Sequence, residues 1–287
     1  MNDSQKITAV LFPSSYFGKT NVDEEFALEY RSAAEKGMFE TILFDQSKWF
    51  DEGRLILTGE GECRALYRGW MMRPEEYTRF YEALGQRGIR LVTAPEAYER
   101  FHIFPNIYGK FSEDTPKMMT VPPGGRYDLA QIKAQLGRFM VKDYVKSVKG
   151  TDFPKYFSAD ITEEEFGRQM EIFYKYRGNL LTGGLCFKQY VDLMKYGECT
   201  NEWRVFYLFG NVLSRCPNSG GPSYAPAPPD ELLNKYSALD SPYYTVDYAE
   251  LADGSWKVLE AGDGSVSGLS PGQDMGAYFR GIKILAG

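Results

Sequence analysis

The sequence predicts an α/β domain over residues 1–105 followed by an α+β domain over residues 106–287. Apolar strand patterns alternate with amphipathic helix patterns through about the first hundred residues, which is typical of a parallel layered sheet. Proline and glycine then become frequent, which indicates a domain boundary. From residue 183 onward the expected strands follow one another through short turns, which favours antiparallel pairing.

The elements of the first domain follow from apolar spacing and from the residues that start and end helices. Gly37 and Gly88 each follow a helix pattern, and Pro74 suits the first turn of the second helix. The expected strands are residues 7–12, 41–45, 66–69 and 89–93, and the expected helices are residues 23–36 and 73–87.

We expect the second domain to divide into subdomains at residues 106–192 and 193–287. Thr162 and Glu165 have the spacing of a capping box at the start of a helix. The expected helices are residues 128–136 and 160–176, and the expected strands are residues 138–145, 185–191, 203–209, 212–216, 243–251 and 256–260. Residues 219–229 are rich in proline, glycine and serine, which predicts a long loop.

Composition excludes several classes of protein. The net charge of -6 argues against nucleic-acid binding through a basic surface. No secretory signal pattern and no membrane-length apolar stretch occurs, so we expect a cytoplasmic protein without a membrane partner. The cysteine spacing fits neither a zinc site nor a disulfide framework, which predicts free thiols at Cys63, Cys186, Cys199 and Cys216.

The single histidine, His102, narrows the possible chemistry. With His102 as the only histidine, we expect no Ser-His-Asp triad, no Cys-His pair elsewhere in the chain and no metal site with several histidine ligands. His102 lies among Phe101, Ile103 and Phe104, a setting that favours a structural role. Catalysis would therefore depend on carboxylates, lysines and arginines.

A predicted hairpin brings two carboxylates together. Residues 253–254 are Asp-Gly, a strong signal for a two-residue turn. The register that this turn sets places Glu250 opposite Lys257, an opposite-charge pair that supports the register. The same register places Asp247 opposite Glu260, and directly opposed carboxylates repel each other.

Three situations would relieve this repulsion between Asp247 and Glu260. A divalent cation could lie between the two carboxylates, one of them could be protonated, or both could be exposed to solvent at a fraying hairpin end. The first situation predicts a magnesium site, because magnesium prefers carboxylate, water and phosphate oxygens. Asp263 follows closely and could supply a further oxygen.

A second predicted hairpin carries two arginines. With a turn at residues 210–211, Phe206 faces Arg215, and Arg204 becomes a diagonal neighbour of Arg215 on the same face. Two arginines on one face suit recognition of a polyphosphate. The alternative is that each arginine pairs with a surface carboxylate.

A lysine interrupts an apolar strand pattern at Lys142, with Met140 and Tyr144 on its own face. A lysine in such a strand must reach the surface, pair with an acid or bind an anion. The alternative is a lysine that protects an edge strand from aggregation. Residues 147–150 are expected to form a flexible loop over phosphates, although the sequence has no glycine-rich phosphate motif.

These segments, in this order, resemble the ATP-grasp superfamily and, more narrowly, its clade defined by one arginine and two lysines. The resemblance covers about residues 138–272. It is carried by five segments, residues 141–147, 187–191, 202–206, 246–247 and 259–264. The first hundred residues resemble the α/β domain that precedes an ATP-grasp module.

The resemblance implies ATP and Mg²⁺ as cofactors and gives roles to the residues. Lys142 would contact the α and β phosphates of ATP, and Arg204 would face the γ phosphate or the acyl phosphate formed from it. Magnesium would be bound by Asp247 and Glu260, with Asp263 as a further candidate. The candidates for nucleotide binding also include Lys146, Lys188, Gln189, Tyr190, Val191 and Arg215, of which residues 188–191 would border the adenine.

Two points of the resemblance stay open. The second lysine of the clade could be Lys146, Lys188 or Lys257, the last being the weakest candidate because the hairpin register gives it Glu250. Many ATP-grasp enzymes carry an asparagine two residues after the metal-binding glutamate, where this chain has Gly262. Either Asp263 substitutes for that asparagine or one metal site is weaker.

The resemblance implies a ligase that activates a carboxylate as an acyl phosphate and joins it to an amine, with an amino acid or a peptide as candidate acceptor. Two other interpretations stay open, a catalytically inactive nucleotide-binding module and an unrelated α/β binding protein. The acceptor site is expected where the N-terminal domain and residues 217–242 approach the triphosphate.

Overall fold

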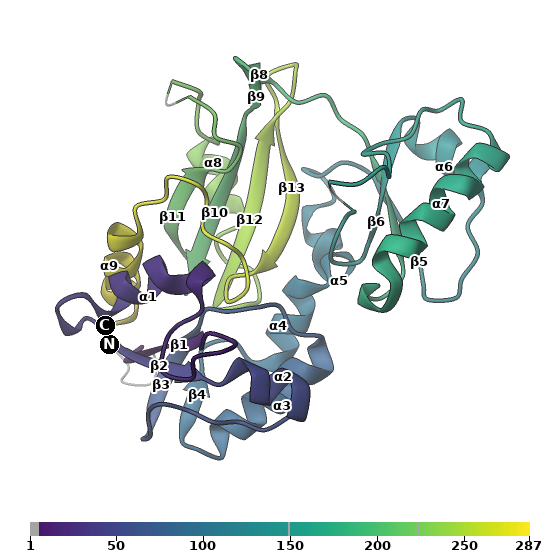
Figure 1. The fold of residues 1–287 in the computed structure, drawn as a ribbon. Coiled ribbons are helices and arrows are strands. Elements are labelled where there is room, and N and C mark those ends of the chain that lie inside the picture. The colour runs from purple at the N-terminus through teal and green to yellow at the C-terminus, as the bar shows by residue number, and fades with distance from the viewer. Residues whose placement is uncertain (1–5, 149, 223) are drawn as a thin grey trace.

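The computed structural model of the protein describes residues 6–148, 150–222 and 224–287. These residues form a four-stranded parallel sheet, a four-stranded antiparallel sheet, a three-stranded sheet and a two-stranded ribbon. Figure 1 shows the parallel sheet below the antiparallel sheet, with the three-stranded sheet and its helices set off to one side. The Ile7 N–H donates to the Ala286 carbonyl at 3.3 Å, so the start and the end of the described chain lie close together.

The parallel sheet confirms the layered α/β unit predicted for the N-terminal residues. Its strand order is β2-β1-β3-β4, and every neighbouring pair is parallel. Its strands are β1 (Ala9–Pro13), β2 (Glu40–Phe44), β3 (Cys63–Tyr67) and β4 (Ile89–Leu91), and its helical segments are η2 (Glu24–Phe26), α1 (Ala27–Ala34), α2 (Gln46–Glu52), α3 (Pro74–Gly85) and α4 (Pro95–His102). Helix α2 is an element that the sequence analysis did not predict.

The three-stranded sheet has the order β5-β7-β6 with antiparallel pairing. Its elements are β5 (Met118–Val121), α6 (Leu129–Leu136), β6 (Phe139–Asp143), α7 (Glu163–Arg177) and β7 (Leu185–Gln189). The Thr162 side chain accepts a hydrogen bond from the backbone N–H of Glu165 and so caps α7 at the predicted place. Phenylalanines from α7, β6 and β7 fill the core beneath this sheet, together with leucine and isoleucine side chains of α6.

The antiparallel sheet has the order β11-β10-β12-β13. Its strands are β10 (Glu202–Leu208), β11 (Asn211–Pro217), β12 (Tyr243–Glu250) and β13 (Trp256–Asp263), and the short ribbon consists of β8 (Lys195–Tyr196) and β9 (Cys199–Thr200). Helix α8 (Asp230–Lys235) follows the segment that was predicted as a long loop. The antiparallel pairing predicted from residue 183 onward is therefore confirmed.

Two of the loops expected from the sequence are described only in part. The expected loop over phosphates, residues 147–150, includes residue 149, which lies outside the described residues. The expected long loop, residues 219–229, includes residue 223, which also lies outside them. The placement of the first loop over a triphosphate therefore stays a prediction.

Buried clusters cross the predicted domain boundary near residue 105. Helix α9 (Met275–Ala286) packs its Phe279 and Ile282 with Val10 and Phe12 of the first strand. Helix α5 (Phe104–Tyr108) packs in one cluster with Tyr244 and other residues of the antiparallel sheet. The boundary itself stays a prediction, and the shared cores hold the two sheets against each other.

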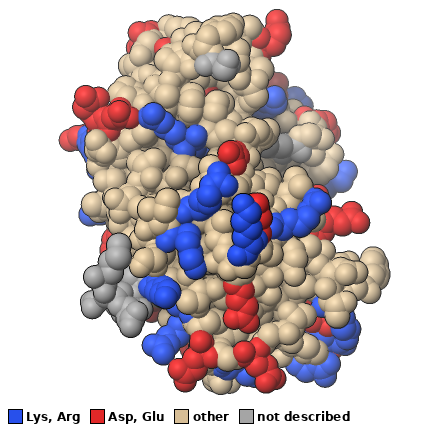
Figure 2. Space-filling view, turned by 90° about the vertical axis from the view of Figure 1, so that its left-hand side faces the viewer, with Lys and Arg blue, Asp and Glu red and all other residues tan. Residues whose placement is uncertain are grey.

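The surface is mixed in charge. Figure 2 shows lysine and arginine side chains gathered near the middle of the face that carries α1 and α9, with acidic side chains toward its ends. Within the described part of the chain, every helix is too short or too polar to cross a membrane.

Candidate active site

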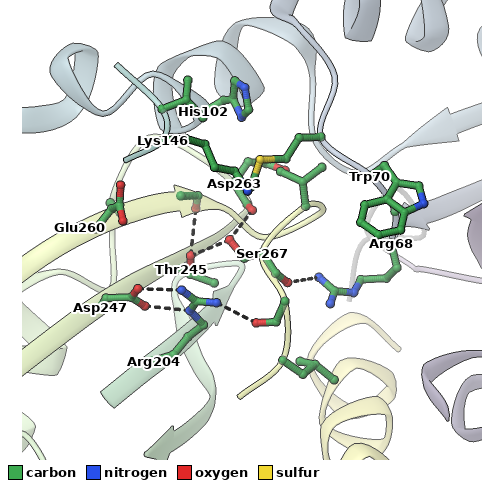
Figure 3. Close-up of a pocket in the computed structure, with 18 of the residues that line it drawn as sticks. Arg68, Trp70, His102, Lys146, Arg204, Thr245, Asp247, Glu260, Asp263 and Ser267 are labelled. Carbon is green, nitrogen blue, oxygen red and sulfur yellow. Dashed lines mark hydrogen bonds and ion pairs between the residues drawn. The ribbon is translucent and has the colours of Figure 1, made fainter. Parts of the chain in front are cut away.

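A cavity of about 920 Å³ lies where the parallel sheet, the three-stranded sheet and the antiparallel sheet come together. The parallel sheet contributes residues that follow β1 and β3, at the carboxyl ends of two adjacent strands. Such strand ends are the usual ligand-binding edge of an open α/β sheet. Figure 3 shows Arg68 and Trp70 on one side of the cavity, with Arg204, Asp247 and Glu260 on the other.

The predicted hairpin of β12 and β13 is wrong near its turn and correct at its carboxylates. The Leu251 N–H donates to the Ser255 carbonyl at 2.7 Å, so the loop has one residue more than predicted. The register therefore places Glu250 opposite Trp256. A bulge at Leu259 then restores the predicted register, and Asp247 lies opposite Glu260.

The predicted pairing of Glu250 with Lys257 is wrong because of this longer loop. Glu250 is buried and accepts hydrogen bonds from the Asn201 side-chain amide at 2.8 Å and from the Tyr196 hydroxyl at 3.1 Å. Lys257 instead donates to the Glu113 carbonyl at 2.9 Å, away from the cavity. Lys257 is accordingly the weakest candidate for the second lysine of the site.

Each of the two opposed carboxylates has its own basic partner. Arg204 donates from Nε and Nη2 to the two oxygens of Asp247 at 2.8 and 2.7 Å. Lys142 donates to the Glu260 carboxylate. This arrangement is a fourth way to relieve the repulsion, which the sequence analysis did not consider: two ion pairs side by side along the sheet.

Charge complementarity keeps these groups ionised. Removal from water opposes ionisation of Glu260, but the Lys142 and Lys188 ammonium groups hold the pKa of its carboxyl below the usual value. Burial likewise works against the charge of Lys142, and Glu260 raises its pKa above the usual value. The side chain of Glu260 remains 43% exposed, so the carboxylate is accessible from the cavity.

Lys188 lies beside Lys142 on the same face of the three-stranded sheet. The register sets Lys142 opposite Cys186 and Met140 opposite Lys188, which places both lysines on one face. Lys188 donates to the carbonyl of Leu259, the bulge residue of β13. Burial lowers the pKa of Lys188 to about 8, a shift that Glu260 partly opposes. The structure thus brings a second lysine to the Lys142–Glu260 pair.

All four residues expected near the adenine, Lys188 included, lie outside the cavity lining. The Gln189 side chain accepts from the Lys117 N–H at 3.3 Å. The Tyr190 ring packs under the Arg138 guanidinium, 4.0 Å from the ring centroid. Val191 follows directly after them. A role for these three residues at the adenine stays a prediction.

The predicted neighbour relation of Arg204 and Arg215 is wrong. The turn between β10 and β11 consists of Phe209 and Gly210, both with positive φ, one residue earlier than expected. Arg215 consequently lies opposite Val205, on the sheet face away from Arg204. It pairs with Asp230 at 2.9 Å on the surface and is not part of the cavity lining. For Arg215, the alternative of a pair with a surface carboxylate is therefore correct.

Asp247 and Glu260 fit a magnesium ion that is bound jointly with phosphate oxygens. They are cross-strand neighbours that both line the cavity, and magnesium commonly takes one or two carboxylates together with phosphates and waters. No group of three histidine, cysteine or acidic side chains close enough to hold a metal occurs among the described residues. Asp263 is therefore not grouped with the other two carboxylates.

Asp263 is buried at the end of β13, with 1% of its surface exposed. Its Oδ1 accepts from the Ser265 N–H at 2.9 Å, and its Oδ2 has no hydrogen-bond partner within the described chain. Burial raises the pKa of this carboxyl to about 7. The shifts of the two carboxyls are therefore opposite in direction, since the pKa of Glu260 is lowered.

The departure at Gly262 has a structural counterpart. A Cβ atom at this position would lie 3.0 Å from Ser267 Oγ and 3.2 Å from Thr245 Oγ1. These hydroxyls are hydrogen-bonded to each other at 2.9 Å, as Figure 3 shows. Two neutral oxygens therefore occupy the place beside Glu260 where a longer side chain would project.

Arg68 is a cavity residue that the sequence analysis missed. It is 1% exposed and binds Glu29 through Nε and Nη2 at 2.7 and 2.9 Å. Its Nη1 donates to the carbonyls of Gly264 and Ser267, in the loop that follows β13. Arg204 donates to Gly268 in the same loop at 2.9 Å. Two arginines from different sheets thus hold this loop against the cavity.

Lys146 and His102 also line the cavity. The Asp143 carboxylate fixes the turn that carries Lys146 by accepting from the Val145 N–H at 2.7 Å, from the Lys146 N–H, and from Arg177 Nε at 2.8 Å. His102 stacks on Tyr98 with a centroid distance of 5.0 Å. Burial lowers the pKa of His102 to about 4, and Lys146 adds to the shift, so the imidazole is neutral at pH 7.

The described residues of segment 217–242 do not contribute to the cavity lining, contrary to the expectation for the acceptor site. They bond instead to the β9 region, where Ser219 Oγ donates to the Thr200 carbonyl and Asn201 donates to Pro226 at 2.9 Å. The N-terminal domain, by contrast, supplies a complete wall of the cavity.

Comparison with known proteins identifies the fold that surrounds this cavity. An ATP-grasp domain family, the third family of the clade named for one arginine and two lysines, matches residues 131–282, just over half of the chain. No curated protein sequence matches the chain with significance.

Several solved ligase structures have a similar fold. D-cycloserine synthetase DcsG is 15% identical with a TM-score of 0.62, covering 97% of this chain and 99% of that chain. ATP-grasp ligase PsnB, complexed with minimal precursor, Mg and ADP, is 12% identical with a TM-score of 0.61, covering 96% and 98%. D-alanine–D-alanine ligase from Bacillus anthracis, complexed with ATP, is 13% identical with a TM-score of 0.62, covering 98% and 96%. These similarities extend over the N-terminal domain and confirm the predicted fold.

Proposed function

Because the chain belongs to this third family of the ATP-grasp clade named for one arginine and two lysines, we propose that it is an ATP- and magnesium-dependent ligase that activates a carboxylate and joins it to an amine. The observation that carries the proposal is the pair of ion pairs, Arg204–Asp247 and Lys142–Glu260, side by side on one wall of the cavity. A triphosphate with magnesium can replace both internal partners, since phosphates pair with the basic groups and magnesium with the acidic groups.

Each residue of this wall has a proposed role. Lys142 and Lys188, on one face of the three-stranded sheet, neutralise the α and β phosphates. Arg204 holds the γ phosphate through its planar guanidinium, and Lys146 approaches from the turn fixed by Asp143. Asp247 and Glu260 would hold magnesium, which when bound draws charge from the β and γ phosphates.

The proposed reaction needs no nucleophile from the protein, which accords with a chain that has one histidine. A substrate carboxylate oxygen bonds to the γ phosphorus while the bond from that phosphorus to the bridging oxygen breaks, and ADP leaves. An amine nitrogen then attacks the carbonyl carbon of the acyl phosphate. The C–O bond to phosphate breaks, phosphate leaves with the electron pair, and the nitrogen loses a proton. The proposed role of Arg204 is to stabilise charge on the transferring phosphoryl group in the first step and on the departing phosphate in the second.

The alternative of an inactive nucleotide-binding module rests on Gly262 in place of the family asparagine. The hydroxyl oxygens of Thr245 and Ser267 lie beside Gly262, and we propose that they take the place of the asparagine oxygen, which weakens the reason for inactivity. Turnover separates the two candidates, because both bind ATP and only the ligase releases phosphate when a carboxylate and an amine are present.

The experiment incubates the protein with ATP, magnesium and an equimolar mixture of amino acids and measures released phosphate. We expect phosphate release above that of the Arg204→Met variant, together with a product whose mass is the sum of two substrates minus one water. Nucleotide binding without release above the variant, across mixtures of amino acids, short peptides and simple amines, would support the inactive module instead.

A further inference from the structure

We infer that the N-terminal wall of the cavity binds the ammonium group of a substrate that carries an apolar side chain, with Glu25 as its counter-ion. The inference rests on the proposed function, because it names the chemistry of one ligase substrate. The apolar contact is made by Phe26, Trp70 and Met71, which line the cavity together with Glu25.

Glu25 is the accessible acidic group of the cavity that lacks a basic partner. Glu29 pairs with Arg68, Asp247 with Arg204, and Glu260 with Lys142. Among the residues that the structure describes, the Glu25 carboxylate has no ion pair and no hydrogen bond, and the residue is exposed. Asp263 also lines the cavity but is 1% exposed. An entering ammonium group therefore finds its counter-ion at Glu25.

The aromatic part of this wall is positioned before any ligand binds. The Asp23 carboxylate accepts from the Glu25 N–H at 3.0 Å and from Trp70 Nε1 at 3.2 Å, and also from the Gln46 amide at 2.7 Å. The rings of Phe26 and Trp70 meet edge to face with a centroid distance of 5.3 Å. One carboxylate thus holds both the segment with Glu25 and the tryptophan in place, which lowers the entropy lost on binding.

The two walls of the cavity favour ligand groups of opposite charge. Basic side chains of Lys142 and Arg204 lie on the sheet wall, which suits a triphosphate, and Figure 3 shows Trp70 on the opposite side from Arg204. Trp70 and Met71 are 41% and 40% exposed, so apolar surface faces the cavity mouth. Aromatic faces attract cations, whereas a second anion near Glu25 would be repelled. The wall therefore selects an amine or an amino acid with an apolar side chain.

The test uses thermal melting with four probes at millimolar concentration: 2-phenylethylamine, ethylamine, 3-phenylpropionate and phenylalanine. We expect 2-phenylethylamine to raise the melting midpoint clearly more than ethylamine, which lacks the ring, and more than 3-phenylpropionate, which has the opposite charge. A larger shift with phenylalanine than with 2-phenylethylamine identifies a free amino acid as the substrate class, and the reverse identifies a simple amine.

Variants locate the effect. Glu25→Gln is expected to weaken apparent affinity for 2-phenylethylamine by about fivefold to tenfold, and Trp70→Ala by a similar factor. The matched control is Glu24→Gln, the neighbouring acid on η2 that does not line the cavity, which should leave the affinity unchanged. Three results would overturn the inference. They are a midpoint shift with 3-phenylpropionate equal to that with 2-phenylethylamine, an affinity for 2-phenylethylamine that Glu25→Gln leaves unchanged, and a melting midpoint that neither amine raises.

The same melting experiment distinguishes a failure of this inference from a failure of the proposed function. ATP with magnesium is added in parallel wells without a probe. If ATP with magnesium raises the midpoint and the amines do not, the assignment of the N-terminal wall to an ammonium group is wrong and the nucleotide site is supported. If ATP with magnesium has no effect while the amines bind at Glu25, the assignment of the N-terminal wall is correct and the ligase proposal is wrong.

Discussion

The hairpins β10–β11 and β12–β13 were predicted by the same reasoning, and they differ in outcome. In both, the turn differs from the dipeptide that the sequence indicates, and in both, one extra residue forms a bulge. In β12–β13 the bulge at Leu259 restores the predicted register at Asp247 and Glu260. In β10–β11 the bulge at Leu213 leaves the register one residue away, which turns Arg215 to the other face.

The two bulges also have different surroundings. The Leu259 carbonyl accepts from Lys188, so this bulge connects the antiparallel sheet to the face of the three-stranded sheet that carries Lys142 and Lys188. Leu213 instead packs against α9, where a Cβ at Gly281 would lie 2.9 Å from its side chain. Bulges often lie next to active sites, where they re-aim a polar group. The comparison shows that the bulge, more than the turn, decides which strand residues reach the site.

The largest expected effect contrasts the two arginines of the first hairpin. Arg204→Met should lower ligase turnover by about a hundredfold to a thousandfold, the usual loss when one group that stabilises transition-state charge is removed. Arg215→Met should leave turnover within about twofold, because Arg215 pairs with Asp230 on the surface. Initial rates of phosphate release measure both.

Equal loss of turnover in Arg204→Met and Arg215→Met, with both variants folded by circular dichroism, would contradict the register of β10 and β11. It would also return Arg215 to the nucleotide site.

The next effect concerns Lys188 and the bulge carbonyl. Its pKa is lowered to about 8 in the folded chain and is near 10.5 in the unfolded chain, so between these values the unfolded chain binds more protons. Stability that depends on Lys188 should therefore increase as pH rises from 8 toward 10. Urea unfolding of the wild type and Lys188→Met should show the wild type gaining relative to the variant over this range.

A difference between wild type and Lys188→Met that stays constant from pH 7 to pH 10 would mean that Lys188 keeps an ordinary pKa. That result would contradict the buried position of the Lys188 ammonium group against the Leu259 carbonyl.

The smallest expected effect is a loss of stability from substitutions in the two turns. Gly254 and Gly210 both have positive φ, at 82° and 77°, and no atom lies within 4 Å of a Cβ at Gly254. Gly254→Ala should cost about 1 kcal/mol of stability through backbone conformation alone, and Gly210→Ala a similar amount. ATP binding should be unchanged in both, because the turns lie outside the cavity lining. Urea unfolding and an ATP titration of each variant check this, and weakened ATP binding in Gly254→Ala alone would show that the second turn is coupled to the site.

Strand periodicity accounts for what could be predicted. Alternation along β6 and β10 places Lys142 and Arg204 inward, and burial then forces each to find an acid. The motif order over about residues 138–272 identified the superfamily and clade of the family model that matches residues 131–282. The opposed carboxylates were placed correctly, although through a turn that is one residue too short and a bulge that compensates for it.

The parts that could not be predicted depend on contacts between distant segments. Arg68 and Glu29 are 39 residues apart, and nothing in the local pattern pairs them. Asp23 joins Glu25 to Trp70 across a similar distance. Such contacts are set by the packing of η2 and α1 against the residues that follow β3 rather than by local periodicity. The nucleotide wall, built from strands, was therefore predictable, and the wall from the N-terminal domain was not.

The most direct test of the nucleotide wall is thermal melting with ATP, with and without magnesium, on the wild type, Glu260→Gln and the exposed control Glu198→Gln. A ligand that binds only the folded state adds about 2.7 kcal/mol of stability at a hundredfold excess over its Kd. We predict that ATP with magnesium raises the midpoint of the wild type and of Glu198→Gln, and that the magnesium-dependent part is lost in Glu260→Gln. A wild-type midpoint that millimolar ATP with magnesium leaves unmoved would contradict the nucleotide site and the ligase proposal with it.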